Sequence, residues 1–141
     1  MSDPIPVTGL AHVGIAVEDA DAVAAAFVTA LGATRGRDDR LAGGALRALF
    51  VHLGPVTFEL LEPRDPDHTV AKFLAARGPG IHHVSLEIAD LEAALARAKD
   101  AGVRLIDEQP RAGADGTRIA FLHPKSLGGV LVELCETKPN G

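Results

Sequence analysis

Two histidines and two glutamates recur at matching positions of the chain. His12 falls on His83 when "HVGIAVEDA" is laid over "HVSLEIADL", at an offset of 71 residues (83 − 12). Glu59 in "FELLE" falls on Glu133 in "VELCE", at an offset of 74 (133 − 59). Neutral imidazoles and carboxylates suit a divalent first-row metal such as Co²⁺, Mn²⁺, Ni²⁺ or Zn²⁺. Four such ligands in an octahedral shell would leave two positions, which can chelate two oxygens and stabilise an enolate.

Taken singly, each of these side chains has a simpler interpretation. A lone histidine is most often a hydrogen-bonded structural residue. The same interpretation applies to three further histidines: His52, His68 and His82. Glu59 alone reads as an exposed strand glutamate. Glu133 lies in "VLVELC", where a charge needs a partner. The repetition at equivalent positions is what favours a metal site.

The stretch "GIHHVSLEI" places two histidines side by side in a predicted strand. Neighbouring side chains of a strand point to opposite faces. His82 shares its face with apolar residues, which must pack against a helix. His83 shares its face with Ser85 and Glu87, and in the repeat it corresponds to His12. We therefore predict that His83 faces an open cleft and binds the metal, while His82 lies at the edge of the apolar face.

Each half of the chain shows the same order of elements. An alternating apolar run predicts a strand, and an Ala-rich helix follows with Asp19 or Asp90 as its N-cap. Gly32 and Gly102 stand where a helix C-cap belongs. Further strand-like runs are "ALRALFVHLG" and "VTFELLE" in the first half, and "RLIDE", "TRIAFLH" and "GVLVELCE" in the second.

These elements predict an α+β fold of two paired βαβββ modules in a single domain. Module one covers about residues 9–63 and module two about residues 81–137. The linker between them, about residues 64–80, contains a short helical pattern from Val70 to Arg77. Neither half alone is large enough to bury a core.

Composition limits the classes of function. The chain has 141 residues, 47% of them apolar and only 4% aromatic, so the core must be aliphatic. A net charge of −5 argues against nucleic-acid binding. The single cysteine, Cys135, is most simply a core residue and fits a reducing cytoplasm. We expect no signal peptide in "MSDPIPVTG" and no membrane association, because the apolar runs are too short to span a bilayer.

The modules and the order His…Glu…His…Glu resemble the vicinal oxygen chelate superfamily, also known as the glyoxalase superfamily. The segments "HVGIAV", "ELLEP", "VAKFL", "GIHHVSLEI", "GVRLIDEQPRAGADGTRIAFLHPKS" and "GGVLVEL" look like those of the methylmalonyl-CoA epimerases. The resemblance covers roughly residues 10 to 136 and is thinner between Thr34 and Leu46. The "GIHH" and "HPKS…GVLVEL" segments are fairly specific.

The resemblance implies a glyoxalase-like fold, in which the modules form a curved mixed sheet around a metal-binding cleft. It implies a divalent ion, Co²⁺ or Mn²⁺ before Ni²⁺ or Zn²⁺, held by His12, Glu59, His83 and Glu133. The implied reaction interconverts the R and S forms of methylmalonyl-CoA, by removal of the C2 proton and through a metal-stabilised enolate. The implied assembly is a homodimer.

The loop "HPKSLGG" before the last strand is a candidate contact for the free carboxylate of the substrate. Its candidate residues are Lys125, Ser126, Gly128 and Gly129. The two glycines allow the backbone to approach a ligand closely. An ordinary hairpin turn explains the same sequence equally well. His123 in this loop is expected to hydrogen-bond the turn.

One stretch departs from the family pattern. Family members usually carry a "PEQG"-like stretch, whose neighbourhood supplies a glutamate thought to act in proton transfer. Here that stretch is "RLAGGALR", with Gly43 and Gly44. Epimerisation normally needs a proton handler on each face of the carbanion. Glu133 could serve one face while it also binds the metal, which leaves Asp38, Asp39 or a water molecule for the other.

This departure keeps two alternatives open. The first is a glyoxalase-like lyase or isomerase acting on another thiol conjugate. The second is a ligand-sequestering binding or resistance protein of the same fold, although such relatives often lose the metal ligands. A ring-cleaving dioxygenase is disfavoured, because its site uses one carboxylate with further His or Tyr residues and this chain has no tyrosine.

Overall fold

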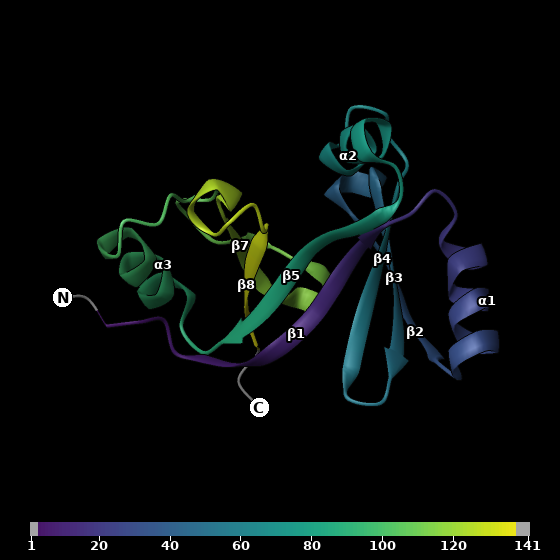
Figure 1. Cartoon of the computed structure of the whole chain (residues 1–141), viewed down its shortest axis with the longest axis horizontal. Helices are drawn as coiled ribbons and strands as arrows, with labels where there is room; N and C mark the ends of the chain where they lie inside the picture. The colour runs from purple at the N-terminus through teal and green to yellow at the C-terminus, as the bar shows by residue number, and fades with distance from the viewer. Residues whose placement is uncertain (1–2, 138–141) are drawn as a thin grey trace. The chain divides into compact units, whose positions relative to one another are not determined.

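The computed structural model describes residues 3–137 and divides the chain into two compact units. The central unit is His12–His82, and the terminal unit combines the residues up to Ala11 with those from His83 onward. The boundary crosses two strands, β1 (Val7–Ala16) and β5 (Gly80–Ile88). The terminal unit therefore contains the first residues of β1, and the central unit contains the first residues of β5. Figure 1 labels both strands.

The central unit arranges its strands in the order β2-β3-β4-β1. Their bounds are β2 (Thr34–Leu41), β3 (Leu46–Leu53) and β4 (Val56–Pro63). β1 runs parallel to β4, whereas β2, β3 and β4 pair antiparallel. Helix α1 (Ala20–Leu31) lies beside these strands in Figure 1. Its apolar side packs on Leu49, Val51 and Leu60, which are fully buried.

The terminal unit repeats this plan in the order β5-β8-β7-β6. Its remaining elements are helix α3 (Leu91–Asp100), β6 (Arg111–Ala112), β7 (Arg118–Leu122) and β8 (Val132–Glu136). β5 and β8 are parallel, and β8, β7 and β6 pair antiparallel. The core contains Ile88, Leu91 and Leu134 and is aliphatic, as the composition predicts. Thr8 at the start of β1 donates to the Glu87 carboxylate of β5 at 2.9 Å.

Local sequence signals account for the helix ends. The side chains of Asp19 and Asp90 accept hydrogen bonds from the N–H groups of Ala22 and Ala93, which confirms both predicted N-caps. α1 ends at Gly32 in the left-handed conformation (φ 72°), as predicted. The cap of α3 is Ala101, one residue before the predicted Gly102, and Gly102 then takes the left-handed conformation (φ 81°).

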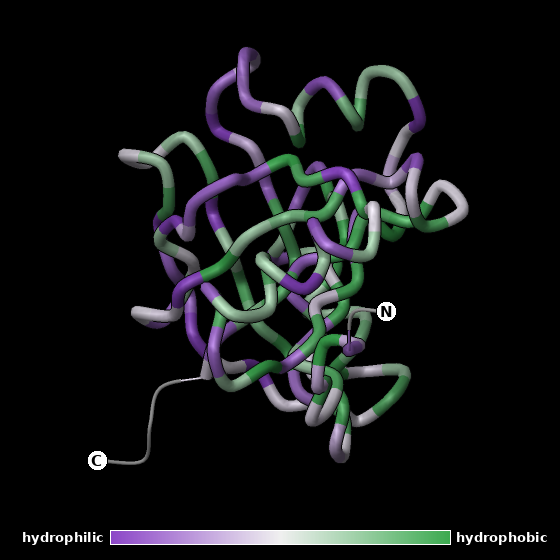
Figure 2. The backbone as a smooth tube through the Cα atoms, turned by 90° about the vertical axis from the view of Figure 1, so that its left-hand side faces the viewer, coloured by the Kyte–Doolittle hydropathy of each residue, from purple (hydrophilic) through white to green (hydrophobic). Residues whose placement is uncertain are grey.

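Helix α2 (Thr69–Arg77) confirms the helical pattern that the linker predicts. Along the tube of Figure 2, short hydrophobic and hydrophilic stretches follow one another, as strands with one buried face require. Among residues 3–137, no helix is long and apolar enough to cross a membrane.

Three strands differ from the sequence prediction, and one of them is the two-residue β6, which the sequence did not predict. The segment "RLIDE" forms no strand, and only a single bridge joins Leu105 to Leu122. The stretch "TRGRDDRL" forms β2, although its sequence predicted no strand. β2 carries five charged residues and lies at the edge of its sheet, so hydrophobic alternation does not reveal it.

Candidate functional site

In the central unit, strands β1 and β4 bring one predicted pair of metal ligands together. Their parallel register sets Gly14 opposite Glu59, so that Glu59 shares a face with His12. His12 Nε2 lies 3.4 Å from Glu59 Oε1. Both residues are buried, with 9% and 5% of their surface exposed. A buried carboxylate beside an imidazole needs a charged partner, so Glu59 is a candidate ligand and not the exposed strand glutamate of the simpler interpretation.

In the terminal unit, strands β5 and β8 hold the second pair in the same arrangement. Ser85 lies opposite Glu133, and His83 Nε2 is 3.8 Å from Glu133 Oε2. His83 is 3% exposed and Glu133 is 4% exposed. Ser85 Oγ donates a hydrogen bond of 2.7 Å to Glu133 Oε1. This serine is fully buried, so it fixes the orientation of the carboxylate.

Two phenylalanines complete the repeated arrangement, and sequence reasoning missed them. Phe50 lies opposite Glu59, and Phe121 lies opposite Glu133. Each ring packs edge-on against the histidine of its own pair, with centroids 6.1 Å apart for His12 and 5.4 Å apart for His83. Phe50 and Phe121 are separated by the same 71 residues (121 − 50) as the histidines. That shared offset is a signal that could have identified them.

The donor atoms of each pair fit coordination of a divalent ion. Two ligand atoms about 2.1 Å from one ion are about 3.0 Å apart at a right angle and about 3.4 Å apart at a tetrahedral angle. The nitrogen–oxygen separations of 3.4 Å and 3.8 Å lie at and slightly above this range. They also exceed the usual length of an N–H···O hydrogen bond. Imidazole and carboxylate together suit Co²⁺, Mn²⁺, Ni²⁺ and Zn²⁺.

The other histidines take structural positions. His82 packs edge-on against Phe73 of helix α2, with centroids 5.0 Å apart. His68 Nδ1 accepts from the N–H of Val70 at the start of α2. His52 Nδ1 lies 3.1 Å from Thr57 Oγ1. The assignment of neighbouring histidines to opposite faces therefore matches the contacts of His82 and the burial of His83.

The loop proposed to contact substrate forms a short 3₁₀ turn, Pro124–Ser126, before β8. His123 Nδ1 accepts from the N–H of Lys125, which confirms its predicted role in the turn. Ser126 Oγ accepts from the N–H of Arg104, so this hydroxyl already stabilises the loop. Gly128 and Gly129 both have positive φ angles, of 69° and 90°, that favour glycine.

A second repeated group of charged residues anchors each helix to its sheet. In the central unit, Arg47 binds Asp21 of α1 and Asp38 of β2 and lies 3.6 Å from Glu62. Glu62 also accepts from the N–H of Ala20 at the start of α1. Hydrogen bonds from Arg47 and Arg40 lower the pKa of Asp38 to about 2, against partial burial. These residues stabilise the fold on the helix side, away from His12.

The terminal unit contains the equivalent group at its surface. Arg118 binds Glu92 of α3 and Glu136 of β8, and Glu136 accepts from the N–H of Leu91. The hydrogen bond from Arg118 lowers the pKa of Glu92 to about 2. Ligand atoms of Glu92, Glu136 and Asp90 lie within 4.8 Å of one another. Because Arg118 neutralises two of these carboxylates, the cluster is not a metal site.

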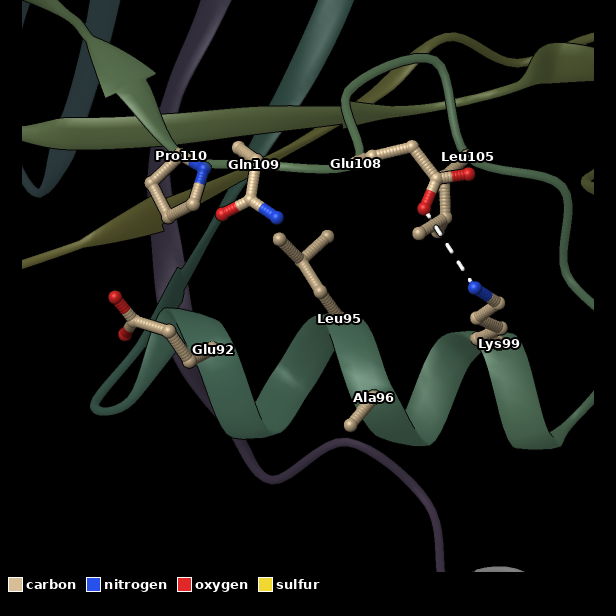
Figure 3. A pocket seen from close by; sticks show the side chains of 8 residues that line it. All are labelled: Glu92, Leu95, Ala96, Lys99, Leu105, Glu108, Gln109 and Pro110. Atoms are coloured by element: carbon tan, nitrogen blue, oxygen red, sulfur yellow. Dashed lines mark ion pairs between the residues drawn. The ribbon is translucent and has the colours of Figure 1, made fainter.

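A shallow hollow of about 280 Å³ lies in the terminal unit between α3 and the segment Leu105–Pro110 (Figure 3). Opposite charges close part of its rim, where Lys99 Nζ is 3.7 Å from Glu108 Oε2. None of its lining residues belongs to the histidine–glutamate pairs. The hollow offers no group for the predicted chemistry.

Comparison with known proteins identifies the family. Residues 11–121 match the family model of the glyoxalase/bleomycin resistance protein/dioxygenase superfamily. The chain belongs to this superfamily. Several of the similar proteins are epimerases. The ethylmalonyl-CoA/methylmalonyl-CoA epimerase of Cereibacter sphaeroides is 39% identical over 127 residues, which cover 89% of this chain and 95% of that protein.

Solved structures agree with this glyoxalase-superfamily assignment. The methylmalonyl-CoA epimerase of Mycobacterium tuberculosis superposes with a TM-score of 0.91 at 38% identity, covering 99% of this chain and 94% of that one. A methylmalonyl-CoA epimerase in complex with methylmalonyl-CoA and NH₄⁺ has a TM-score of 0.87 at 34% identity, covering 94% and 96%. These matches confirm the predicted glyoxalase-like α+β fold and the predicted family.

Proposed function

We propose that this chain is an isomerase that interconverts the R and S epimers of methylmalonyl-CoA. The similarity to methylmalonyl-CoA epimerases over almost the whole chain carries this proposal. One of the similar structures contains methylmalonyl-CoA itself, which supports an acyl-CoA as the substrate class. The buried histidine–glutamate pairs support the proposal, because imidazoles and carboxylates are suitable ligands for the ion that this chemistry would use.

We propose that His12, Glu59, His83 and Glu133 together hold one divalent ion. Each pair has the donor types that such an ion requires, with nitrogen–oxygen separations at or slightly above the range for two ligands of one ion. When bound, the ion supplies a Lewis acid that polarises a thioester carbonyl and so acidifies the adjacent C2–H. Co²⁺ or Mn²⁺ is the proposed ion, ahead of Ni²⁺ and Zn²⁺.

Glu133 is the proposed proton-transfer group on one face of C2. Ser85 holds its Oε1 by a hydrogen bond of 2.7 Å, while its Oε2 points toward His83. A carboxylate held in this way presents one oxygen in a constant direction, which favours proton transfer. Its burial limits its contact with bulk water.

The proposed contacts for the free carboxylate of the substrate are Lys125, Ser126, Gly128 and Gly129. Lys125 supplies a cation, and the left-handed glycines leave the backbone accessible to an anion. Because Ser126 Oγ is occupied by Arg104, its contribution would come from the backbone and from holding the loop.

Proton exchange tests the proposed function. Metal-loaded protein is incubated with methylmalonyl-CoA in D₂O, and the C2 proton is followed by NMR beside a chelator-treated control. We expect metal-dependent exchange together with inversion at C2. Absence of exchange with either epimer in the metal-loaded protein would contradict the proposal. Turnover of a hemithioacetal without turnover of the CoA ester would move the chain to a glyoxalase-like activity.

Two broader properties complete the proposal. We propose a cytoplasmic location, which suits a chain whose single cysteine, Cys135, can form no disulfide within the chain. We also propose a homodimer, which the family resemblance implies. Light scattering of the purified protein tests the assembly, and a molar mass of one chain at micromolar concentration would contradict it.

A further inference from the structure

Inversion at C2 requires proton transfer on both faces of the carbon, and Glu133 alone can act on only one face. The proton leaves from one face of the carbon and a proton must return to the other. A single group that removes and returns the proton on its own face gives exchange without inversion. If the chain is the proposed epimerase, it must therefore carry a second proton-transfer group.

Strand register separates the two aspartates of β2 that could supply this group. Asp38 lies opposite Leu49, a residue of the core beneath helix α1. Asp39 lies opposite Ala48, and Ala48 lies opposite Leu61 of β4. Since Leu61 is two residues from Glu59, Asp39 is on the same face of the sheet as Glu59 and His12. Asp38 faces the helix.

The contacts of the two side chains agree with the register. Asp38 accepts hydrogen bonds from Arg47 and Arg40, and Arg47 is buried beneath α1. Asp39 instead accepts from the guanidinium of Arg37, at 3.0 Å and 3.3 Å. The side chain of Arg37 is 55% exposed, whereas that of Asp39 is 18% exposed. Asp39 is thus a partly buried carboxylate held by a surface cation.

The turn that follows strand β2 presents only small residues. This turn, Ala42–Gly44, carries no side chain larger than a methyl group. A Cβ added at Gly43 or Gly44 would meet nothing within 4 Å. In an ideal sheet, Asp39 and Glu59 lie two strands and two residues apart, or about 12 Å between Cα atoms. That spacing leaves room for a substrate carbon beside an ion held at Glu59 and within reach of the Asp39 carboxylate, directly or through one water.

His52 is the main competitor on this face, since it lies opposite Thr57 and two residues from Phe50. Its counterpart at the 71-residue offset is His123, a turn residue that accepts from the N–H of Lys125. His52 likewise contacts Thr57 across its own hairpin. By contrast, Asp39 corresponds to Pro110, so this carboxylate belongs to the central unit alone. A second proton-transfer group is needed only once in the active site. Asp39, which has no counterpart in the other unit, fits this requirement better than His52.

We propose that Asp39 is the second proton-transfer group, acting on the face of C2 opposite Glu133; this role rests on the proposed epimerase function. In one direction the Asp39 carboxylate accepts the C2 proton. The C–H electron pair forms a C1–C2 double bond, and the thioester carbonyl becomes an enolate oxygen. The enolate then collapses as the Glu133 carboxyl delivers its proton to C2. In the other direction the two groups exchange roles.

The test compares Asp39→Asn with its neighbour variant Asp38→Asn in D₂O, starting from each pure epimer. In Asp39→Asn, we expect inversion to slow by about 100-fold to 10,000-fold, the range for loss of a general acid or base. Deuterium should still enter one epimer with retention, because Glu133 keeps working on its own face. Asp38→Asn should invert at the wild-type rate. Both variants should bind metal as the wild type does, as measured by calorimetry.

Three outcomes would overturn the role of Asp39. One is inversion by Asp39→Asn within about threefold of the wild type. Another is equal loss of exchange from both epimers, which would indicate a general disturbance of the site. The third is loss of inversion in His52→Gln but not in Asp39→Asn. If Asp39→Asn does not fold, Asp39→Ser takes its place. A wild-type protein without any exchange would contradict the epimerase function itself, so the two failures remain distinct.

Discussion

At the residue scale, the structure is organised around polar groups that are almost fully buried. Each histidine of a pair has a glutamate oxygen within 3.8 Å and a phenylalanine against its ring. Burying a carboxylate without a partner is costly, so such groups are retained where they bind a cation or transfer a proton. His82, next in sequence to one of these histidines, packs instead against Phe73.

The neighbouring histidines should respond differently to substitution. We expect His83→Ala to abolish metal binding, since it removes a buried ligand. We expect His82→Ala to leave metal binding intact and to lower the free energy of unfolding by about 1 kcal/mol, through loss of an aromatic contact. Metal content by mass spectrometry and urea unfolding measure the two effects. Retention of metal by His83→Ala with loss in His82→Ala would reverse our assignment of the faces.

Ser85 should tune the metal site without contacting the ion. Ser85→Ala removes the hydrogen bond to Glu133 Oε1, and we expect metal affinity to fall about 10-fold to 100-fold. Ser126→Ala is a matched control, because Ser126, in the loop before β8, accepts from the backbone N–H of Arg104 and does not hydrogen-bond a glutamate. Titration with Co²⁺ measures both affinities. An unchanged affinity in Ser85→Ala would show that the serine has only a packing role.

At the scale of elements, the sequence repeat extends to the groups that hold helix and sheet together. Asp21, Arg47 and Glu62 of the central unit correspond to Glu92, Arg118 and Glu136 of the terminal unit, at the offsets of 71 and 74 that relate the ligand pairs. Each glutamate also accepts a backbone N–H from the first turn of its helix. The same contacts thus orient both helices on their sheets.

The two arginines should differ in their contribution to stability. The side chain of Arg47 is 6% exposed, whereas that of Arg118 is 44% exposed. We expect Arg47→Met to lower the free energy of unfolding by about 3 kcal/mol, because the buried guanidinium and its contacts with Asp21, Asp38 and the nearly buried Glu62 are lost. Arg118→Met should cost much less stability than Arg47→Met, since water screens its ion pairs. Equal losses in urea unfolding would contradict the burial argument.

Acid should reveal the contribution of Asp38. The pKa of its carboxyl is lowered from 3.8 to about 2, chiefly by the hydrogen bond from Arg47. A lowered pKa stabilises the fold fully above the unfolded value, and this stabilisation is lost as pH falls through the folded value. We therefore expect wild-type stability to decline between pH 4 and pH 2 more steeply than that of Asp38→Asn. Parallel curves from thermal unfolding would contradict this expectation.

At the scale of the whole molecule, the chain contains two related units with one histidine–glutamate pair each. Duplication of a βαβββ plan explains why charged, aromatic and capping residues all recur at constant offsets. Asp39 and the turn Ala42–Gly44 break this symmetry, and both lie in the central unit. We therefore expect residues that differ between the two halves, such as Asp39, to carry the chemistry that is specific to the substrate.

Metal binding should be linked to the stability of the whole chain. If four side chains hold one ion, titration should give one ion per chain, and saturating metal at 100 times Kd should add about 2.7 kcal/mol to the free energy of unfolding. His12→Ala and His83→Ala should each abolish this gain, although they lie in different units. Binding of two ions per chain, or a gain that survives in either variant, would show that the pairs act as separate sites.

The sequence by itself determined the repeat, the helix caps and the four candidate ligands. These follow from local rules, since alternation along one strand decides which side chains share a face. It gave no indication of β2, whose charged edge sequence lacks that alternation, and it predicted a strand at "RLIDE" that does not form.

Tertiary structure alone decided which residues meet across strands. The hydrogen bond from Ser85 to Glu133, the packing of Phe50 and Phe121, and the burial of Arg47 all depend on cross-strand register. Register also separates Asp38 from Asp39, which sequence reasoning left as equal candidates. A shift of one residue turns every side chain of a strand to the other face, so the pairing of strands in the folded sheet decides which residues meet.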